Sequence, residues 1–427
     1  MTFKENLAKF LSKEEIESLF NSFNLEDKHA VILNTDKMND EEFLELFPHV
    51  SPHPITKHAY LFDKNEYQLG KVLYHELGCF YIQEPSAMSV ASLIPEMDHA
   101  LILDMCAAPG GKTIQTAFKN KDATIISNDL SKSRTGALLS NIERLGISNV
   151  VISNNDFSLI YENYLETFDM IILDAPCSGS GMFRKDDKMI DDWSINKVYK
   201  FAELQKELLS IAYKMLKPGG IISYSTCSYS YEEDEEVILS QKDKNPDLII
   251  LPLDNVPYTY VNKSCPIGVR FMPNKFPGEG QYLVLIQKPG ERKRTIFKNE
   301  NKYQNLYPFL RDDLQINKYG ENYFALNNNI NIKKLNVIRY GVKLGEFDGK
   351  IYRYDLHLAR SDYSYNMNKV ELTLDEVKVY LSGNVINHPN DFKGFILLTY
   401  KNKTVDIAKT DGRVIKNYYP KGLRHNY

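Results

Sequence analysis

The middle of the chain alternates between short apolar runs and amphipathic stretches, and this alternation constrains the fold more than any other feature. Runs of strand character are followed by segments of helical periodicity. Such an order is typical of βαβ units and predicts a doubly wound α/β fold, with a parallel sheet covered by helices on both faces. The expected strands are 101–104, 124–128, 150–153, 170–173 and 220–225, and the expected helices are 113–119, 132–145 and 198–216.

The segment before this pattern is mixed in character. Ser12 followed by Glu15 forms a capping box, which predicts a helix running through Phe20. Residues 71–82 are apolar enough for a strand, and 87–93 favour a helix. We therefore expect an α+β subdomain at the N-terminal end.

The segment after the pattern is richer in strand signals. Gly278-Glu279-Gly280 predicts a turn, and the run 281–287 that follows it would complete a hairpin at the edge of the sheet. Near the C-terminal end, the runs 394–400 and 404–409 lie between Gly and Asn turns. This spacing predicts a small β-rich module.

A chain of 427 residues is too long for one hydrophobic core, so we expect several units. The expected divisions are an N-terminal accessory or RNA-binding subdomain over 1–90, the α/β domain over 91–290, a connecting domain over 291–368 and the β-rich module over 369–427. No internal repeat is evident.

The composition indicates a globular protein with reduced thiols. Apolar residues make up 43% of the chain, but no apolar run approaches the roughly 18 residues that span a membrane. The five cysteines are widely spaced, with no CxxC pair, so neither a zinc site nor a disulfide framework is expected. We expect a cytoplasmic protein that acts as a monomer and holds no metal.

The charge is unevenly distributed along the chain. The formal net charge is -4, yet the stretch 401–427 holds seven Lys or Arg against Asp406 and Asp411. The stretch 290–318 is also basic, with seven Lys or Arg against four acids. Local basic stretches of this kind can bind phosphates although the whole chain is acidic.

A loop of small residues follows the first expected strand and predicts a cofactor site. Its residues are Cys106, Ala107, Ala108, Pro109, Gly110, Gly111 and Lys112. Glycines let a ligand approach the backbone, and the helix that follows offers free N–H groups. A Walker A loop is excluded because Cys106 stands where that motif needs glycine, and no GxGxxG is present.

Three acids stand just after later strands: Asp129, Asp156 and Asp174. Asp129 is placed to bind a ribose hydroxyl pair, and Asp156 to read an adenine amino group. Any one of them could instead cap a helix. Taken together with the loop, they suit an adenosyl ligand without a triphosphate, so we expect S-adenosylmethionine.

Two cysteines stand in matched settings, Cys177 in Asp174-Ala175-Pro176-Cys177 and Cys227 in Ser225-Thr226-Cys227. Both follow apolar strands, so both should reach the same edge of the sheet. Two thiols there could attack C6 of a pyrimidine, one as nucleophile and one as helper, and residue types alone do not say which is which. Cys79 and Cys265 are expected to be small buried hydrophobes.

With these motifs in order, the chain strongly resembles the Sun-type (NSUN-like) RNA cytosine-5 methyltransferases, in their bacterial RsmF-like branch. The matching segments are 106–113, 174–181, 183–186, 225–228, 232–236, 270–273 and 278–280. Beyond them, 341–346 and 417–424 look like that branch, which carries a C-terminal PUA-like RNA-binding module and methylates small-subunit rRNA. The resemblance implies a Rossmann-like methyltransferase sheet and 5-methylcytosine as the product.

The resemblance also implies roles for individual residues. Cys227 would be the nucleophile, Cys177 would assist product release, and Asp174 would bind the N3/N4 edge of the cytosine. The catalytic lysine of the family corresponds to Lys185 or Lys112, which the sequence leaves open.

The partner expected for such an enzyme is RNA, either small-subunit rRNA or the assembled small subunit. Candidate RNA contacts are Arg184, Lys185, Lys421 and Arg424. Two alternatives are the same chemistry on tRNA and a non-catalytic ribosome assembly factor on a methyltransferase scaffold. An amino-methyltransferase is disfavoured, because such enzymes have Asn/Asp-Pro-Pro-Tyr where this chain has Asp174-Ala175-Pro176-Cys177.

Overall fold

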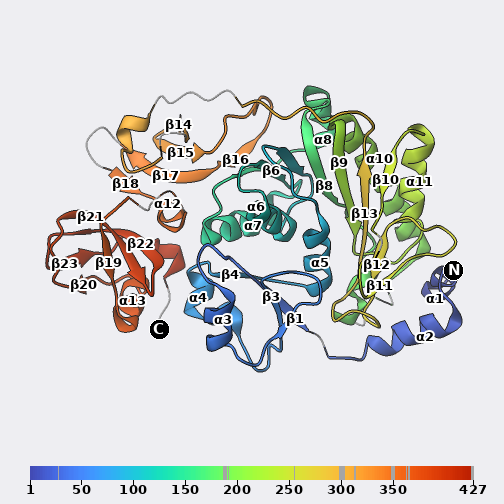
Figure 1. Ribbon diagram of the computed structural model, residues 1–427, viewed down its shortest axis with the longest axis horizontal. Coiled ribbons are helices and arrows are strands. Elements are labelled where there is room, and N and C mark those ends of the chain that lie inside the picture. The colour runs from blue at the N-terminus through green and yellow to red at the C-terminus, as the bar shows by residue number, and fades with distance from the viewer. Residues whose placement is uncertain are drawn as a thin grey trace.

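A sheet with a parallel centre runs through the middle of the molecule (Figure 1). The computed structural model describes residues 1–26, 28–185, 190, 192–253, 255–297, 303–311, 314–347, 352–361, 363 and 366–424. The parallel strands are β5 (Leu101–Asp104), β6 (Thr124–Asn128), β7 (Val150–Ser153), β8 (Phe168–Asp174) and β9 (Leu216–Thr226). The five expected strands are therefore confirmed, with β8 and β9 longer than predicted.

Antiparallel strands extend this sheet on both sides. They are β10 (Ile249–Leu251), β11 (Thr259–Tyr260), β12 (Val269–Phe271), β13 (Gln281–Gln287) and β16 (Val337–Tyr340). The order among the described residues is β11-β12-β13-β9-β8-β5-β6-β7-β16, with β10 also paired to β13. The predicted hairpin is confirmed, since β12 and β13 pair antiparallel and β13 lies against β9.

Helices cover both faces of the sheet, as the doubly wound prediction requires. They are α5 (Pro85–Leu93), α6 (Gly111–Lys119), α7 (Lys132–Leu145), α8 (Phe157–Ile160), α10 (Ile195–Met215) and α11 (Glu235–Lys244). Along β8, Met170 and Ile172 pack in the core beneath α6 and α7, whereas Ile171 and Leu173 pack in the core beneath α10 and α11. Because both faces are buried, the strand is apolar at each position from Met170 to Leu173.

The N-terminal region divides into two parts. The helices α1 (Phe3–Leu7) and α2 (Lys13–Ser22) pack against the α/β domain, and Ser12 and Glu15 form the predicted capping box. A separate four-stranded sheet follows. Its elements are β1 (His29–Leu33), α3 (Asp40–Leu46), β2 (Ser51–Pro52), β3 (Ala59–Phe62), α4 (Leu73–Glu76) and β4 (Phe80–Gln83).

The prediction of a strand over 71–82 is wrong for its first half. The helix α4 occupies that half, and only β4 is extended. Gly78, at φ 72°, ends the helix in a left-handed turn, in which its N–H bonds to His75 O and that of Cys79 bonds to Tyr74 O. This turn is a Schellman motif, which ends a helix at a glycine. The apolar residues around Gly78 favoured a strand, so the sequence analysis did not identify the glycine as the end of a helix.

The segment expected to connect two domains forms a sheet of its own and also contributes to the central one. The strands β14 (Gln315–Tyr319), β15 (Asn322–Leu326), β17 (Val342–Phe347) and β18 (Tyr352–Tyr354) pair in that order. Between them β16 crosses over to pair antiparallel with β7. A helix, α12 (Leu356–Arg360), packs on α7 through the close contact of Gly146 with Arg360 O.

The C-terminal residues form the expected β-rich module. Its elements are β19 (Lys369–Glu371), α13 (Leu374–Leu381), β20 (Ile386–Asn387), β21 (Gly394–Tyr400), β22 (Lys403–Thr410) and β23 (Val414–Lys416). Short 3-10 helices occur at η1 (Leu69–Lys71), η2 (Tyr161–Tyr164), η3 (Ser180–Lys185), η4 (Gln304–Leu306) and η6 (Lys421–Leu423).

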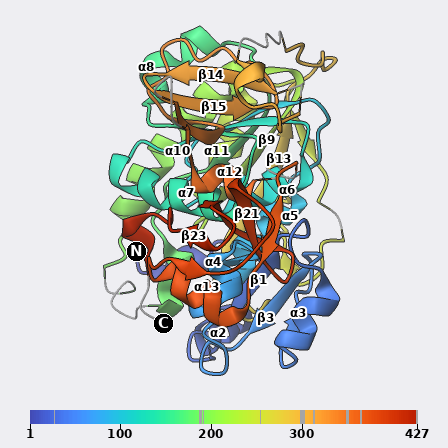
Figure 2. The same ribbon diagram turned by 90° about the vertical axis from the view of Figure 1, so that its left-hand side faces the viewer.

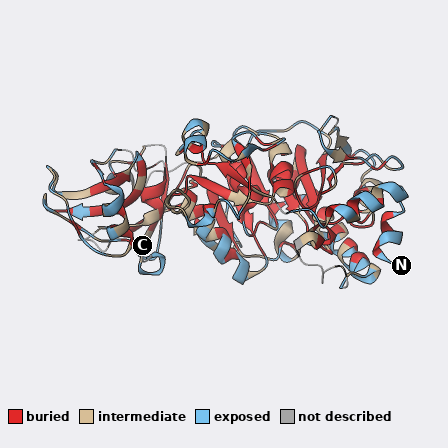
Figure 3. Cartoon of the chain, turned by 90° about the horizontal axis from the view of Figure 1, so that it is seen from below, coloured by how far each residue is buried: buried red, intermediate tan, exposed pale blue. Residues whose placement is uncertain are grey.

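The C-terminal module is packed against the N-terminal sheet. One apolar cluster contains Val31 and Phe80 of that sheet together with Val377, Ile396 and Ile415 of the module. Figure 2 shows the module in front of the central helices, with β14 and β15 above it, and Figure 3 shows buried residues in the module as well as in the central sheet. The N-terminal sheet and the C-terminal module therefore stabilise one another.

Candidate active site

Three loops meet at the carboxyl end of the parallel strands. Asp104 ends β5 and Asp174 ends β8, and the register pairs Asp104 with Ile172 and Asp174 with Ser225 of β9. Neighbouring parallel strands thus end at one edge of the sheet, which is where ligands of such sheets bind. The loops that follow them carry the predicted cofactor residues and both matched cysteines.

The two cysteines lie against each other. Their Sγ atoms are 3.0 Å apart, and both side chains are partly exposed. The hydrogen bond with Cys227, burial and the nearby Glu233 raise the pKa of Cys177 well above the ordinary value. Cys177 is therefore a thiol at neutral pH and can donate its S–H to Cys227.

Glu233 holds the two cysteine loops together, a role that the sequence analysis missed. Its fully buried carboxylate accepts hydrogen bonds from Ser178 N at 2.7 Å, from Ser228 Oγ at 2.6 Å and from Gln205 Nε2 at 3.1 Å. Burial raises the pKa of Glu233, and these hydrogen bonds oppose that rise. Its only sequence signal was its place in the acidic run after Cys227.

The rest of the acidic run anchors other segments behind the site. Arg270 is fully buried, and it donates to Glu235 Oε1 at 2.5 Å and to Asp234 Oδ2 at 2.9 Å. Glu232 accepts hydrogen bonds from Asn6 and Lys9 of the N-terminal region. The acidic run and Arg270 belong to one structural unit, which explains why these two motifs occur together.

Asp174 lies between a lysine and a serine. Lys112 Nζ is 2.7 Å from Asp174 Oδ2, and Ser225 Oγ donates to Asp174 Oδ1 at 2.8 Å. Lys112 is buried on α6, whereas the Asp174 side chain is 37% exposed. Of the two candidate lysines, Lys112 is in contact with Asp174; the side chain of Lys185 lies outside the described part of the chain.

The position after the first cysteine motif, Gly181, has no room for a side chain. A Cβ there would lie 2.7 Å from both Cys227 O and Gly280 O, and its N–H donates to Cys227 O at 2.7 Å. Arg184 secures the same region, since it donates to Gly278 O at 3.3 Å and lies 3.7 Å from Glu279. Only 4% of the Arg184 side chain is exposed, because it packs against these loops.

The predicted cofactor loop turns sharply between β5 and α6. Ala107 N–H donates to Asn128 O at 2.7 Å, and Ala108 N–H donates to Asp129 Oδ2 at 3.1 Å. Gly110 adopts φ 111° at the start of α6, a conformation that favours glycine. A Cβ at Gly110 would lie 2.9 Å from Leu138, so the loop also depends on a small residue there.

The floor of this loop is acidic and buried. Burial raises the pKa of Asp104 to about 7, and Asp104 Oδ1 has no hydrogen-bond partner among the described residues. Burial and the carboxylates of Asp104, Asp174 and Asp129 raise the pKa of Cys106, so Cys106 remains a thiol. An orphaned carboxylate oxygen among other acids suits a cationic ligand such as the sulfonium of S-adenosylmethionine.

The other two predicted acids differ in exposure. Asp129 is buried and accepts N–H bonds from Ala108 and, at 2.8 Å, from Ser131, with lone pairs left for further donors. Asp156 is exposed and caps α8 by accepting a hydrogen bond from Ser158 N at 2.9 Å.

The remaining predicted residues lie away from the thiol pair. Lys421 and Arg424 are exposed on the C-terminal module, at the opposite end of Figure 1 from α1 and α2, which pack beside the cysteine loops. Cys79 is fully buried, and burial raises its pKa to about 11. Cys265 is only partly buried.

None of the described helices is long and apolar enough to cross a membrane. No three His, Cys, Asp or Glu side chains within the described ranges lie together as metal ligands would.

Comparison with known families covers most of the chain. Residues 90–287 match the family model of the 16S rRNA methyltransferases RsmB/F, residues 1–85 match the N-terminal domain of 16S rRNA methyltransferase RsmF, and residues 367–425 match the PUA domain of methyltransferase RsmF.

Individual relatives and solved structures agree with these matches. Ribosomal RNA small subunit methyltransferase F of Escherichia coli (strain SE11) is 31% identical over 93% of this chain and 90% of its own, and that of Aliivibrio fischeri (strain MJ11) is 31% identical over 93% and 91%. A methyltransferase homolog from Pyrococcus horikoshii is 27% identical with a TM-score of 0.58, covering 67% of this chain and 94% of its own. NSun6 from Pyrococcus horikoshii, solved with SFG, shares the fold at 21% identity, with a TM-score of 0.60 and coverage of 67% and 97%. The chain belongs to the ribosomal RNA small subunit methyltransferase F family.

Proposed function

We propose that this enzyme transfers a methyl group from S-adenosylmethionine to C5 of a cytidine in 16S rRNA, through a covalent bond between Cys227 and C6 of the base. The observation that carries the proposal is the pair of thiols 3.0 Å apart beside Asp174 at the carboxyl end of the sheet. C5 of cytosine is a poor nucleophile, and addition of a thiolate to C6 makes it enamine-like.

The cofactor would bind over the loop 106–112, with its cationic part toward Asp104 and its ribose toward Asp129. When bound, S-adenosylmethionine supplies the methyl group as an electrophile. The acidic floor of the loop favours a positive charge there, and the turn at Gly110 leaves the backbone accessible to the ligand.

The thiols divide the work of addition and elimination. Cys227 adds to C6 as a thiolate, and after methyl transfer C5 loses its proton as the C6–S bond breaks, so that the electron pair of the C5–H bond forms the C5–C6 double bond and that of the C6–S bond returns to Cys227. Cys177, which its raised pKa keeps protonated at neutral pH, passes its proton to this leaving sulfur and takes up the C5 proton in its place, so that both thiols are restored.

Asp174 and Lys112 would hold the base during this sequence. Addition at C6 moves electron density toward N3, and a donor at N3 stabilises the adduct. Lys112 and Asp174 are 2.7 Å apart, which supports a role as proton donor and acceptor for the N3/N4 edge. Lys112 is therefore our candidate for the catalytic lysine.

The test is methyl transfer from labelled S-adenosylmethionine to purified small subunits, naked 16S rRNA and tRNA, with the labelled nucleoside identified. We expect 5-methylcytidine from subunits or rRNA. The same nucleoside from tRNA alone would overturn the substrate and leave the chemistry intact. A different methylated nucleoside would overturn the chemistry.

A further inference from the structure

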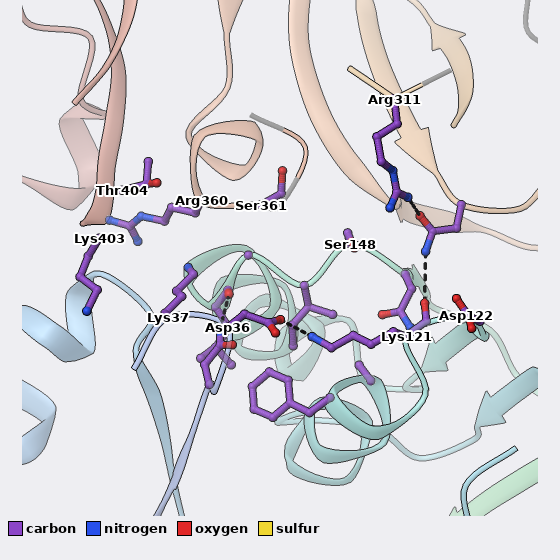
Figure 4. Close-up of a pocket in the computed structure, with 18 of the residues that line it drawn as sticks. Asp36, Lys37, Lys121, Asp122, Ser148, Arg311, Arg360, Ser361, Lys403 and Thr404 are labelled. Atoms are coloured by element: carbon purple, nitrogen blue, oxygen red, sulfur yellow. Dashed lines mark hydrogen bonds and ion pairs between the residues drawn. The ribbon is translucent and has the colours of Figure 1, made fainter. Parts of the chain in front are cut away.

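A polar cavity of about 420 Å³ lies at the opposite end of the central sheet from the thiol pair. Its wall includes residues 117, 118, 121 and 122, which precede β6, and residues 145–149, which precede β7. These are the amino ends of the parallel strands. Single residues and short segments from the N-terminal region, the connecting segment and the C-terminal module complete the wall (Figure 4).

The cavity is basic although the chain as a whole is acidic. The charged residues in its wall are Lys37, Lys121, Arg311, Arg360 and Lys403 against Asp36 and Asp122. Figure 4 shows Lys37 and Arg360 on one side of the cavity and Arg311 on the other. These side chains come from distant parts of the sequence, so only folding concentrates their charge.

Some of these cations already have carboxylate partners. Lys403 lies 2.8 Å from Glu42, and Arg360 lies 3.2 Å from Glu76; both glutamates lie behind the wall. Lys121 pairs with Asp36. Arg360 is nonetheless 3% exposed with its Nε lacking a hydrogen-bond partner among the described residues.

Lys37 differs from the other lysines of the wall. Its ammonium donates to Leu77 O at 3.2 Å, and no described carboxylate lies within ion-pairing distance. Burial and the neighbouring Arg360 and Arg144 lower the pKa of Lys37 to about 7, although Cys79 and Asp36 act in the opposite direction. A half-buried ammonium among arginines is destabilised, and a bound anion would relieve that cost.

We propose that this cavity binds a backbone phosphate of the RNA substrate. The choice of RNA rests on the proposed function, because the phosphodiester is the anion that an rRNA methyltransferase meets. The cavity lies at least about 15 Å from the carboxyl edge of the sheet, because β6 and β7 are five and four residues long at roughly 3.3 Å each. The bound RNA must therefore extend well beyond the reacting cytidine.

The first test asks whether the cavity binds a tetrahedral anion. Thermal unfolding of the full chain is measured in sulfate and in chloride at equal ionic strength. Sulfate should raise the midpoint of the wild type more than that of Lys37→Met. Lys242→Met is the matched control, because Lys242 also donates to a single carbonyl, Leu248 O at 3.0 Å, but lies on α11 away from the cavity.

A second pair of variants leaves Lys37 in place. Thr404 lies in the cavity wall, so Thr404→Asp places a carboxylate beside the cations, whereas Thr404→Asn has the same size without the charge. The sulfate effect should be lost with Asp and kept with Asn. An equal sulfate effect in all five proteins would overturn the anion site.

The second test identifies the source of the phosphate. The affinity for a 16S rRNA fragment is measured against salt, and Lys37→Met should reduce the slope of log K against log [salt] by about 1. A trinucleotide containing the target cytidine should bind wild type and variant equally. If sulfate binds but the slope is unchanged, the RNA assignment is wrong, and the site serves a free phosphorylated molecule.

This outcome is separable from failure of the proposed function. Sulfate and RNA binding are measured without catalysis, whereas cytosine-5 transfer is read from the labelled nucleoside. If the enzyme methylates another position, the salt slope of Lys37→Met still reports on the cavity.

Discussion

The two ends of the central sheet have opposite electrostatics. At the carboxyl end, Asp104 and Asp129 lie at the cofactor loop, Glu233 joins the loops of the two thiols, and Lys112 is the cation in contact with Asp174. At the amino end, five basic side chains line a cavity with two aspartates. The same strands thus separate an acidic site from a basic one.

This difference shows how one sheet can serve two ligands of opposite charge. At the carboxyl end, burial raises the pKa of Asp104, which favours a cationic ligand, and the hydrogen bond with Cys227 together with burial raises the pKa of Cys177, which favours a protonated helper thiol. At the amino end, burial lowers the pKa of Lys37, which favours an anion. Because the two sites lie at opposite ends of the sheet, the charges that favour a cation at one do not oppose the charges that favour an anion at the other.

The largest effect is expected from the thiol pair. Cys227→Ser should reduce methyl transfer by at least about ten-thousandfold, because the serine hydroxyl is a poor nucleophile. Cys177→Ser should instead accumulate a covalent protein–RNA adduct, detected as a band that survives denaturing electrophoresis. Cys265→Ser, a partly buried thiol outside the pair, is the control. Adduct accumulation by Cys227→Ser would reverse the two roles.

The acidic end should make stability depend on pH. The folded pKa of Asp104 is about 7 against roughly 3.9 unfolded. Between these values the folded state holds a proton that the unfolded state lacks, so stability present below pH 4 is lost as pH rises through 7. Denaturant unfolding at pH 5 and pH 8 should show Asp104→Asn losing less stability than wild type, by up to about 3 kcal/mol, since about two pH units below the folded pKa are crossed at roughly 1.4 kcal/mol each. If wild type and Asp104→Asn lose equal stability between the two pH values, the raised pKa does not belong to Asp104.

Glu233 should matter more for geometry than for charge. Glu233→Gln keeps the size but removes a carboxylate that accepts bonds from both cysteine loops, and we expect kcat to fall by about tenfold to a hundredfold. Loss of the negative charge should also lower the pKa of Cys177, measured as alkylation rate against pH. An unchanged alkylation profile would mean that Glu233 does not act on that thiol.

The smallest effect is expected on the C-terminal module. Lys421→Ala should weaken rRNA binding by about twofold to threefold, as for one exposed phosphate contact, with cofactor binding unchanged. Arg424 is a poorer choice, because it holds Tyr419 O at 3.2 Å. Deletion of the module would expose the apolar cluster that it shares with the N-terminal sheet, so a point substitution is the cleaner measurement.

Most of the fold could be predicted from the sequence, because most strands and helices are indicated by neighbouring residues. The bounds of β5, β6, β7, α7 and β13 follow from apolar runs and the residues that end them. It failed at 71–82, where composition favoured a strand and Gly78 stops a helix. It also missed β16, whose pairing with β7 joins segments almost two hundred residues apart.

The sequence by itself determined that Cys177 and Cys227 would meet, since parallel strands end at one edge of a sheet. Only the tertiary structure decided that Glu233 joins their loops, that Arg184 is buried, and that Lys37 and Arg360 reach one cavity. The physical reason is the distance along the sequence between the residues that determine each property. Strand direction is set by neighbouring residues, whereas burial, partners and pKa depend on packing between segments that the sequence holds far apart.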